Sequence, residues 1–518
     1  MNRDDALRRI REHAAETAWD VVVIGGGATG LGVAVDAASR GHSVALFEQS
    51  DFGKGTSSRS TKLVHGGVRY LKQGNVPLVM EALRERGILR QNAPHLVTDL
   101  PFVVPNYKWW EAPFYGVGMR VYDVLAGKYG FGHSKNLSVE ETIERLPTIE
   151  TEGLRGGVVY HDGQFDDARL LVHLAMTATE QGAALVNYCP VIGIAKDADG
   201  FTSGVLVRDA ESGEELNVPA RVVVNATGAF TDAVRAMDDP KARAIIRPSQ
   251  GVHIVLDREF LPGSNAIMVP ETDDGRVLFA IPWHDRVLVG TTDTPIEAIE
   301  LEPRAFEEEV TFLVEHAARY LTRDPTTADI RSVFIGIRPL VAEGESDETA
   351  EISREHAVRI SDSGLLTIAG GKWTTYRKMA QDVVDFCETL GDLESRPCVT
   401  EDLQIHGWHQ HAEQFGRLDV YGSDAVELEE LMAGDPAMAE TVHPAFELTR
   451  AEVVWACQEE MARTVDDVLA RRSRALIFNA RAALEAAPAV AEIMREELGR
   501  DEAWVEATLE DFEEVADA

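Results

Sequence analysis

The chain has 518 residues, enough for about three domains and a large buried core. Its 87 acidic and 50 basic side chains give a net charge of −37, which disfavours nucleic-acid binding and repels anionic lipid at long range. The four cysteines form no C-x-x-C pair, which argues against a zinc ribbon or an iron–sulfur cluster and favours a reduced cytosolic compartment. We expect neither a signal peptide, because the first residues are charged, nor a membrane span.

The acidic surface is also poor in lysine, and no lysine follows Lys378. This composition is typical of a protein from a high-salt cytoplasm, where screening reduces self-repulsion. A GC-rich genome that favours arginine, together with an acidic tail, would produce the same composition. The charge therefore describes the solvent and leaves the reaction open.

A strand–turn–helix near the N-terminus carries the clearest motif. Residues 21–24 are predicted to form a buried strand, and Gly25, Gly27 and Gly30 follow in G-x-G-x-x-G spacing before a helix. These glycines allow a tight turn, the approach of a pyrophosphate to the backbone and close packing of the helix. Glu48 ends the next predicted strand, about 20 residues past the first glycine, where a ribose-binding acid is expected. The segment therefore predicts a dinucleotide-binding site.

The segments that follow alternate between loops and regular elements. Residues 49–72 are dense in glycine and hydroxyl side chains, which predicts an ordered loop whose donors wrap a phosphate or an isoalloxazine ring. A helix is expected over about 77–92. Residues 98–135 hold aromatics and prolines without clear periodicity, so we expect irregular structure over the active site or an adhesive surface. A helix at 166–181 and strands at 184–188, 204–208 and 221–225 are predicted next.

The second half of the chain changes character twice. Strand signals between 252 and 289 and a helical pattern near 303–320 predict an α+β substrate domain inserted into the nucleotide-binding fold. The chain then returns with residues 335–340 and 364–377, where a double glycine between a strand and a helix offers a second place to hold a flavin. Beyond about 395, alanine- and glutamate-rich helices predict a separate helical domain.

Four sequence blocks together resemble a known family. They are residues 23–30, 56–71, 336–340 and 370–377, of which the first is shared by many flavoproteins and the second and fourth are specific. Residues 452–499 resemble the helical C-terminal domain of the same family. Over nearly its whole length the chain is therefore similar to FAD-dependent glycerol-3-phosphate dehydrogenases.

The resemblance implies an α/β fold in three parts. We expect an FAD-binding, Rossmann-like domain of the glutathione-reductase type, an inserted α+β substrate domain and a C-terminal all-α domain. The expected boundaries are 1–100 for the first FAD-binding segment, 101–240 for its continuation with the irregular active-site segment, 241–334 for the substrate domain, 335–392 for the last FAD-binding segment and 393–518 for the helical domain.

The resemblance also implies a reaction. FAD would oxidise sn-glycerol 3-phosphate to dihydroxyacetone phosphate by hydride transfer from C2 to flavin N5, and the electrons would pass to a membrane quinone or to a membrane electron-acceptor subunit. No nucleic acid is expected as a partner, and a homodimer stays open. The expected location is cytoplasmic, with peripheral attachment to the cytoplasmic face of the membrane left open.

Three alternatives compete with this assignment. Glycerol-3-phosphate oxidases share the second block but typically carry an insertion before the fourth, and here only a short ordinary segment separates 336–340 from 370–377. Anaerobic dehydrogenase subunits usually have a cysteine-rich C-terminal module, which this chain lacks. The third alternative is a non-catalytic flavin-binding subunit.

Oxidation of a secondary alcohol by a flavin needs a base for the hydroxyl proton. The resemblance places His65 at the flavin face as a candidate base, and a structural role in orienting the flavin loop is the alternative. His253, from the predicted substrate domain, is the rival. Both stay open at this point.

The substrate phosphate is a dianion that planar guanidinium groups bind well. Arg69, Tyr70 and Arg338 match substrate-pocket positions of the family, although each arginine would also fit a structural salt bridge. Lys372 follows the double glycine, where a cation would neutralise the reduced flavin or contact a substrate oxygen.

The remaining candidates concern the cofactor and metals. The expected cofactor contacts are Gly25, Gly27, Gly30, Glu48, Ser57, Ser58, Lys62, Leu63, Gly67, Ala226, Gly228, Gly371 and Thr374. His406, His409 and His411 have metal-like spacing but no accompanying cysteine or carboxylate pattern. We therefore expect surface histidines there and no metal site.

Overall fold

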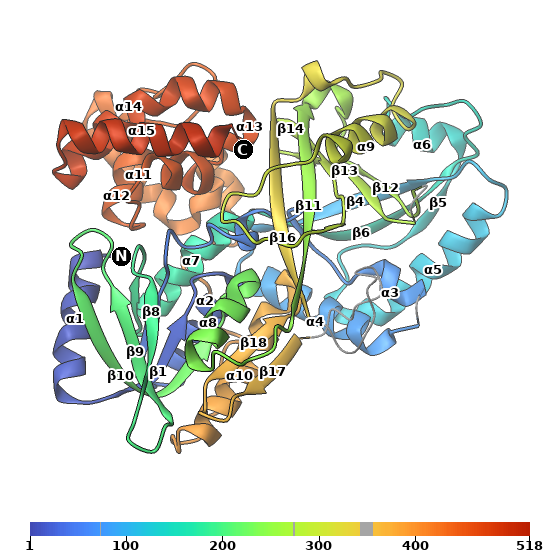
Figure 1. Cartoon of the computed structure of the whole chain (residues 1–518). Helices are drawn as coiled ribbons and strands as arrows, with labels where there is room; N and C mark the ends of the chain where they lie inside the picture. Colours follow the sequence, from blue (N-terminus) through green and yellow to red (C-terminus); the bar gives the residue numbers. More distant parts are fainter. Residues whose placement is uncertain (73, 273–274, 342–355, 518) are drawn as a thin grey trace.

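The structure, a computed structural model, describes residues 1–72, 74–272, 275–341 and 356–517. Two β-sheets and a C-terminal helical domain make up the described chain, with the helical domain above the first sheet and the second sheet beside it (Figure 1). This architecture confirms the predicted α/β fold with a C-terminal all-α domain. None of the helices in the described ranges combines the length and the apolar character needed to cross a bilayer.

The first sheet is the nucleotide-binding sheet. Its central strands run parallel, and β1 (Trp19–Ile24) lies between β2 (Val44–Phe47) and β10 (Glu215–Asn225). The other strands are β7 (Ala184–Val186), β8 (Val191–Lys196), β9 (Thr202–Arg208), β17 (His356–Ile360) and β18 (Leu366–Gly370). Both faces of the central strands are buried, as expected for a parallel sheet covered on each side.

The side chains of β1 alternate between two apolar layers, one on each face of the sheet. Val21 and Val23 pack with α2 (Ala28–Ser39), α7 (Asp167–Glu180) and α10 (Tyr376–Leu390). Val22 and Ile24 pack on the opposite face with α1 (Arg3–Glu16) and the β8–β9–β10 strands. The short helix α8 (Thr231–Asp238) follows β10.

The second sheet is mixed and is built around long antiparallel pairs. β11 (Ile246–Asp257) pairs with β16 (Ser332–Val341) over ten residues, and β4 (Val97–Pro105) pairs with β6 (Gly157–Phe165). The remaining strands are β3 (Leu63–Val64), β5 (Lys135–Leu137), β12 (Ala266–Val269), β13 (Leu278–Trp283), β14 (Arg286–Gly290) and β15 (Thr294–Pro295). Its helices are α3 (Val68–Lys72), α4 (Val76–Asn92), α5 (Glu111–Ala126), α6 (Val139–Arg145) and α9 (Glu307–Ala318).

Strand pairing joins segments that the predicted boundaries separate, and the boundaries themselves stay predictions. Strands β4, β5 and β6 lie within the segment assigned to the nucleotide-binding domain, and β16 lies mostly in its assigned last segment, yet all four pair in the second sheet. The prediction of irregular structure over 98–135 is wrong, because β4 and α5 are regular elements there. Sequence pattern indicates strands but does not give the partner of a strand, so the assignment of β4, β5 and β6 to the second sheet could not be predicted from the pattern.

The C-terminal domain contains helices and no strand among its described residues. They are α11 (Ala425–Gly434), α12 (Arg450–Gln458), α13 (Ala475–Phe478), α14 (Ala480–Leu498) and α15 (Glu502–Ala516). Their apolar faces share a core that includes Val453, Met494 and Phe512. Residues Asp467–Arg472 form a π-helical turn, and the side chains of this turn reach toward the first sheet.

Candidate active site

A long cavity of about 450 Å³ runs along the carboxyl ends of the parallel strands and continues between the two sheets. Ile24 and Phe47 close its floor at the ends of β1 and β2, and Ala226 follows the end of β10. At the other end the cavity reaches His253 of β11 and Arg338 of β16. Ligands of open α/β sheets bind at this edge, so the cavity lies where the glycine motif predicts a dinucleotide.

The glycine motif forms one end of this cavity. Gly25 has a φ of +107°, and a Cβ there would lie 2.8 Å from the carbonyl oxygen of Ala226. A Cβ on Gly30 would lie 1.9 Å from the carbonyl oxygen of Gly25, so Gly30 lets α2 pack on the turn without itself lining the cavity. Gly27 caps α2 and lines the cavity. The helix N-terminus therefore faces the space where a diphosphate would lie.

Glu48 is fixed at the end of β2 by backbone donors. Its carboxylate accepts hydrogen bonds from the backbone N–H groups of Gly26, at 2.7 Å, and Ser50, at 2.9 Å. Burial raises the pKa of this carboxyl group. Glu48 lines the cavity, so an oxygen acceptor stands at the position expected for a ribose hydroxyl.

Two glycines expose their backbone to another part of the cavity. A Cβ added to Gly55 or Gly228 would meet no heavy atom within 4 Å, although both glycines line the cavity. The backbone at these positions therefore borders open space, as a broad ligand with a diphosphate and a ring system requires. Ser57, Leu63, Ala226, Gly371 and Thr374 line the same space. These residues fit a flavin dinucleotide.

The far end of the cavity gathers side chains from four separate segments. His65 follows β3, Tyr70 lies in α3 and Lys372 follows β18, and all three line one space with His253 of β11 and Arg338 of β16. The Nζ of Lys372 lies 4.0 Å from the centroid of the Tyr70 ring. The backbone N–H of His65 donates to Thr374 Oγ1, at 3.2 Å, which ties two of these segments together. The cavity thus ends in a cationic, histidine-containing pocket.

His253 is the most enclosed of these side chains. Its ring stacks on Phe334 with 4.6 Å between centroids, and its Nε2 lies 3.0 Å from Thr61 Oγ1. Burial holds the pKa of His253 well below its usual value, and the positive charges of Lys62 and Arg338 lower it further. The imidazole is therefore neutral near pH 7 and able to accept a proton.

Arg338 is held rigidly by its neighbours. Its guanidinium donates to Thr291 Oγ1 and to the carbonyl oxygen of Thr292, each at 3.0 Å, and lies 3.2 Å from Asp293 Oδ1. The two roles that the sequence left open therefore coexist, because Arg338 lines the cavity and also forms a salt bridge. A clamped guanidinium of this kind is a suitable phosphate ligand.

Comparison with known proteins agrees with this site. Residues 20–377 match the model of the FAD dependent oxidoreductase family, and residues 364–505 match that of the C-terminal domain of alpha-glycerophosphate oxidase. The mitochondrial glycerol-3-phosphate dehydrogenase of Homo sapiens is 41% identical over 518 residues, which cover 93% of this chain and 71% of that protein. The chain belongs to the FAD-dependent glycerol-3-phosphate dehydrogenase family. The enzyme of Bos taurus is also 41% identical, over 95% of this chain and 72% of its own.

Solved structures give the same family. The glycerol-3-phosphate dehydrogenase from Bacillus halodurans, complexed with FAD, superposes with a TM-score of 0.80 at 30% identity and covers 99% of this chain and 97% of its own. The L-alpha-glycerophosphate oxidase from Mycoplasma pneumoniae, with FAD bound, reaches a TM-score of 0.58 at 16% identity over 75% of this chain and 99% of its own, which shows a shared fold alone. FAD is the cofactor of this dehydrogenase family, as the sequence predicted.

Two of the expected cofactor contacts lie behind the cavity wall of this family member. Lys62 has a φ of 60° and a fully buried side chain whose Nζ donates to Asp167 and to the carbonyl oxygen of Ser58, each at 2.7 Å. Ser58 is buried beside it, and neither residue lines the cavity. Lys62 has a left-handed backbone and points inward, while its neighbours Thr61 and Leu63 line the cavity, so contact of Lys62 and Ser58 with the cofactor stays a prediction.

Three other residues singled out by the sequence lie in different surroundings. Gly67 does not line the cavity, but a Cβ there would lie 2.6 Å from the Tyr70 ring, so it allows Tyr70 its position. Arg69 lies in α3, and its side chain is outside the described residues. His406 was expected at the surface but is half-buried between Glu180 and Asp424, whose ion pairs outweigh burial and raise its pKa to about 9. The described residues contain no group of three metal-ligating side chains.

Sequence reasoning missed two cations of the cavity wall. Lys54 and Arg59 line the cavity, and both form ion pairs with Glu302, at 3.3 and 2.5 Å. Their alternation with glycine and hydroxyl residues in 54–60 was the available signal. Such a composition indicates an ordered loop but does not show which charged side chains border the ligand space.

Proposed function

We propose that this chain oxidises sn-glycerol 3-phosphate to dihydroxyacetone phosphate by transfer of the C2 hydride to the flavin. The observation that carries the proposal is the single cavity in which the dinucleotide-binding turn continues into a pocket with His253, Arg338 and Lys372. When bound, FAD supplies the hydride acceptor. The names of relatives with 41% identity support the same reaction.

The side chains of the pocket have distinct proposed tasks. Arg338, clamped by Thr291 and Asp293, binds the substrate phosphate. Lys372 places a positive charge at the end of the cavity. There it stabilises negative charge on a substrate oxygen or on the edge of the flavin ring. Neutral His253 accepts the hydroxyl proton, and the backbone N–H of His65, bonded to Thr374, fixes the segment that follows β3. The predicted role of His65 as the base remains the competing proposal.

Anaerobic titration of the oxidised holoenzyme tests the reaction. Glycerol 3-phosphate is expected to bleach the visible flavin band, whereas glycerol at the same concentration leaves it unchanged because it lacks the dianion that Arg338 binds. A flavin that glycerol 3-phosphate does not reduce would contradict the proposal and favour a non-catalytic flavin-binding subunit. Stoichiometric hydrogen peroxide formation in air, with no reduction of a quinone, would instead assign an oxidase.

We further propose that the electrons pass to a quinone in a membrane on which the protein docks through α5. Trp110, Phe114, Val117, Val121 and Val124 repeat at helical spacing along α5, and all five side chains are exposed. Single exposed apolar residues are ordinary on protein surfaces, but an unbroken stripe along one helix marks an interaction surface. The helix lies at the edge of the molecule, away from the C-terminal domain (Figure 1).

The other face of α5 contacts the segment that leads to the pocket. Tyr122 is buried, and its hydroxyl accepts a hydrogen bond from the backbone N–H of Gly66, at 2.8 Å, next to His65. The same hydroxyl donates to Asp162 at 2.8 Å. A membrane bound at the outer face of α5 would therefore lie on the side of the molecule next to the segment that carries His65. The predicted homodimer stays a prediction.

A further inference from the structure

Residues 49–62, called here the cofactor loop, connect β2 to β3 and separate the cavity from the C-terminal domain. One side of the loop lines the cavity with Lys54, Thr56, Ser57 and Arg59. Among the described residues, none beyond Met379 lines the cavity. The C-terminal domain therefore contacts the back of the loop and not the ligand space.

Two consecutive arginines of the C-terminal domain bind one buried carboxylate of this loop. Asp51 is fully buried and accepts hydrogen bonds from Arg471 Nε and from both terminal nitrogens of Arg472, at 2.6 and 3.0 Å. The π-helical turn makes this possible, because its wider winding, with Ser473 N bonded to Val468 O at 2.8 Å, brings neighbouring side chains to the same target.

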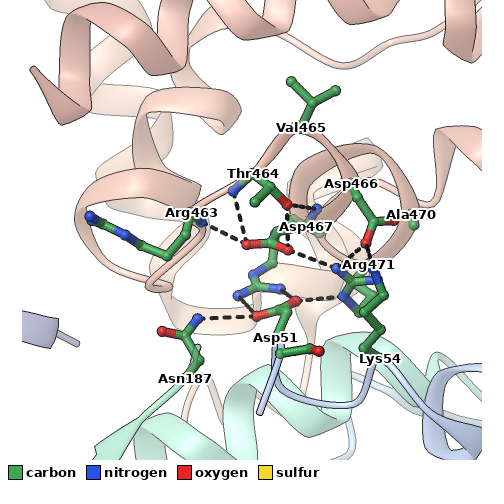
Figure 2. Close-up of polar contacts among 12 residues, drawn as sticks. Asp51, Lys54, Asn187, Arg463, Thr464, Val465, Asp466, Asp467, Ala470 and Arg471 are labelled. Atoms are coloured by element: carbon green, nitrogen blue, oxygen red, sulfur yellow. Dashed lines mark hydrogen bonds and ion pairs between the residues drawn. The ribbon is translucent and has the colours of Figure 1, made fainter. Parts of the chain in front are cut away.

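A second link joins the loop to the same turn. Asp466 Oδ2 accepts hydrogen bonds from Lys54 Nζ, at 3.0 Å, and from Arg471, at 2.8 Å (Figure 2). The positive charges of Arg471 and Lys54 hold the pKa of Asp466 far below its usual value, although burial acts in the opposite direction. Lys54 therefore lines the cavity and is also bonded to Asp466 of the C-terminal domain.

A third link fixes the end of the loop. Arg474, which follows the turn, donates to the carbonyl oxygen of Ser58 at 3.0 Å and to Asp167 of α7 at 2.9 Å. Buried charges are stable only when their partners are in place. The three links to the C-terminal domain therefore form only when the cofactor loop is in this position. The conformation of the cofactor loop is therefore coupled to the C-terminal domain.

We propose that Asp466, Arg471 and Arg472 are positioning residues for FAD, which hold the cofactor loop in the shape that receives the dinucleotide. They act through Asp51 and Lys54 and do not contact the ligand space themselves. The inference depends on FAD binding only and is independent of the substrate. It gives the C-terminal domain a function in cofactor retention.

Asp466→Asn tests the proposal with little risk to folding. Arg471 keeps Asp51 and Asp467 as partners in this variant, and Lys54 keeps Glu302. We expect FAD to leave the diluted holoenzyme about ten times faster than from the unaltered chain, a factor within the usual range of coupling between two sites. Flavin fluorescence follows the release. Hydrogen exchange of residues 49–62 in the apoprotein should be faster as well.

The control variant is Glu211→Gln. Glu211 belongs to a different ion-pair cluster, which joins the first sheet to the C-terminal domain. Glu211 accepts from Arg463 at 2.6 and 2.7 Å and pairs with Arg500, but it lies between β9 and β10 and does not line the cavity. We expect this variant to lower Tm without changing FAD release. Asp51→Asn, which cuts the larger link, should release FAD faster still.

Two results would overturn the proposal. The first is FAD release at the unaltered rate from folded Asp466→Asn. The second is equal acceleration by Glu211→Gln, because that would reduce the effect to general stability of the domain contact. A Tm loss in both variants with faster release in Asp466→Asn alone is the result that supports positioning.

Discussion

At the scale of single residues, Arg338 is the side chain whose role is most open to measurement. Arg338→Ala removes the guanidinium fork and leaves Asp293 without this cation beside the cavity. We expect a strongly raised KM and a loss of about 2–5 kcal/mol in kcat/KM, as for a truncated buried charge pair. Steady-state kinetics with glycerol 3-phosphate measure both quantities.

The matched control for Arg338 is Arg331→Ala. Arg331 precedes the same strand, is exposed and pairs with Asp257 away from the cavity. This variant should keep the KM of the unaltered enzyme, and both variants should retain FAD. An unchanged KM in Arg338→Ala would rule out the phosphate clamp.

His253 leads to a pH prediction. Its pKa is depressed below the ordinary 6.5 by burial and by the charges of Lys62 and Arg338, so the neutral, proton-accepting form persists as the pH falls through 6.5. If His253 is the base, the anaerobic rate of flavin reduction stays level from about pH 8 to about pH 6. Stopped-flow absorbance gives this rate. A decline with its midpoint near 6.5 would exclude His253, and normal reduction in His253→Gln would do the same.

Lys62 shows where residue-level prediction from sequence ends. The motif around it identifies a cavity-lining segment, and Thr61 and Leu63 do line the cavity. Which side chain turns inward depends on a left-handed backbone at a non-glycine residue, and the partner Asp167 is 105 positions away. Neither feature leaves a local pattern in the sequence.

At the scale of elements, helix α2 and its turn depend on one glycine. Gly30→Ala would place a Cβ 1.9 Å from the carbonyl oxygen of Gly25, so the turn and the helix must separate. We expect loss of bound FAD and a lower Tm, measured by flavin content and thermal unfolding. Gly118→Ala in α5 is the control, because its Cβ meets no atom within 4 Å, and it should stabilise the protein by up to about 1 kcal/mol. Retained FAD in Gly30→Ala would contradict the close packing.

Elements were predicted well where their pattern is local. The strand, glycine turn and helix of residues 19–39 follow from glycine spacing and apolar runs, and α4 from its helical pattern. The segment 98–135 was misread because α5 is apolar on both faces, with Tyr122 buried and Val117 and Val124 exposed, so its amphipathic period is weak. The pairing of β4 with β6 spans more than fifty residues, and no local signal encodes it.

At the scale of the whole molecule, charge is distributed unevenly. The chain carries −37, yet residues 107–135 around α5 hold four basic side chains, Lys108, Arg120, Lys128 and Lys135, against the acidic Glu111 and Asp123. The cations of this segment favour an anionic membrane surface, and the rest of the molecule is repelled from it. Under the proposed membrane docking, this asymmetry would orient the protein with α5 toward the bilayer.

Val124→Asp tests that orientation. Val124 is 80% exposed at the end of the apolar stripe, so an aspartate there leaves the fold intact but places a charge in the contact with lipid. We expect weaker binding to vesicles with anionic lipid in flotation assays and slower reduction of a membrane quinone. Flavin reduction by glycerol 3-phosphate should keep its rate, because the pocket is unchanged. The control is Val426→Asp, an exposed valine of α11 in the C-terminal domain, which should bind vesicles normally. Equal binding of both variants would place the membrane contact elsewhere on the molecule.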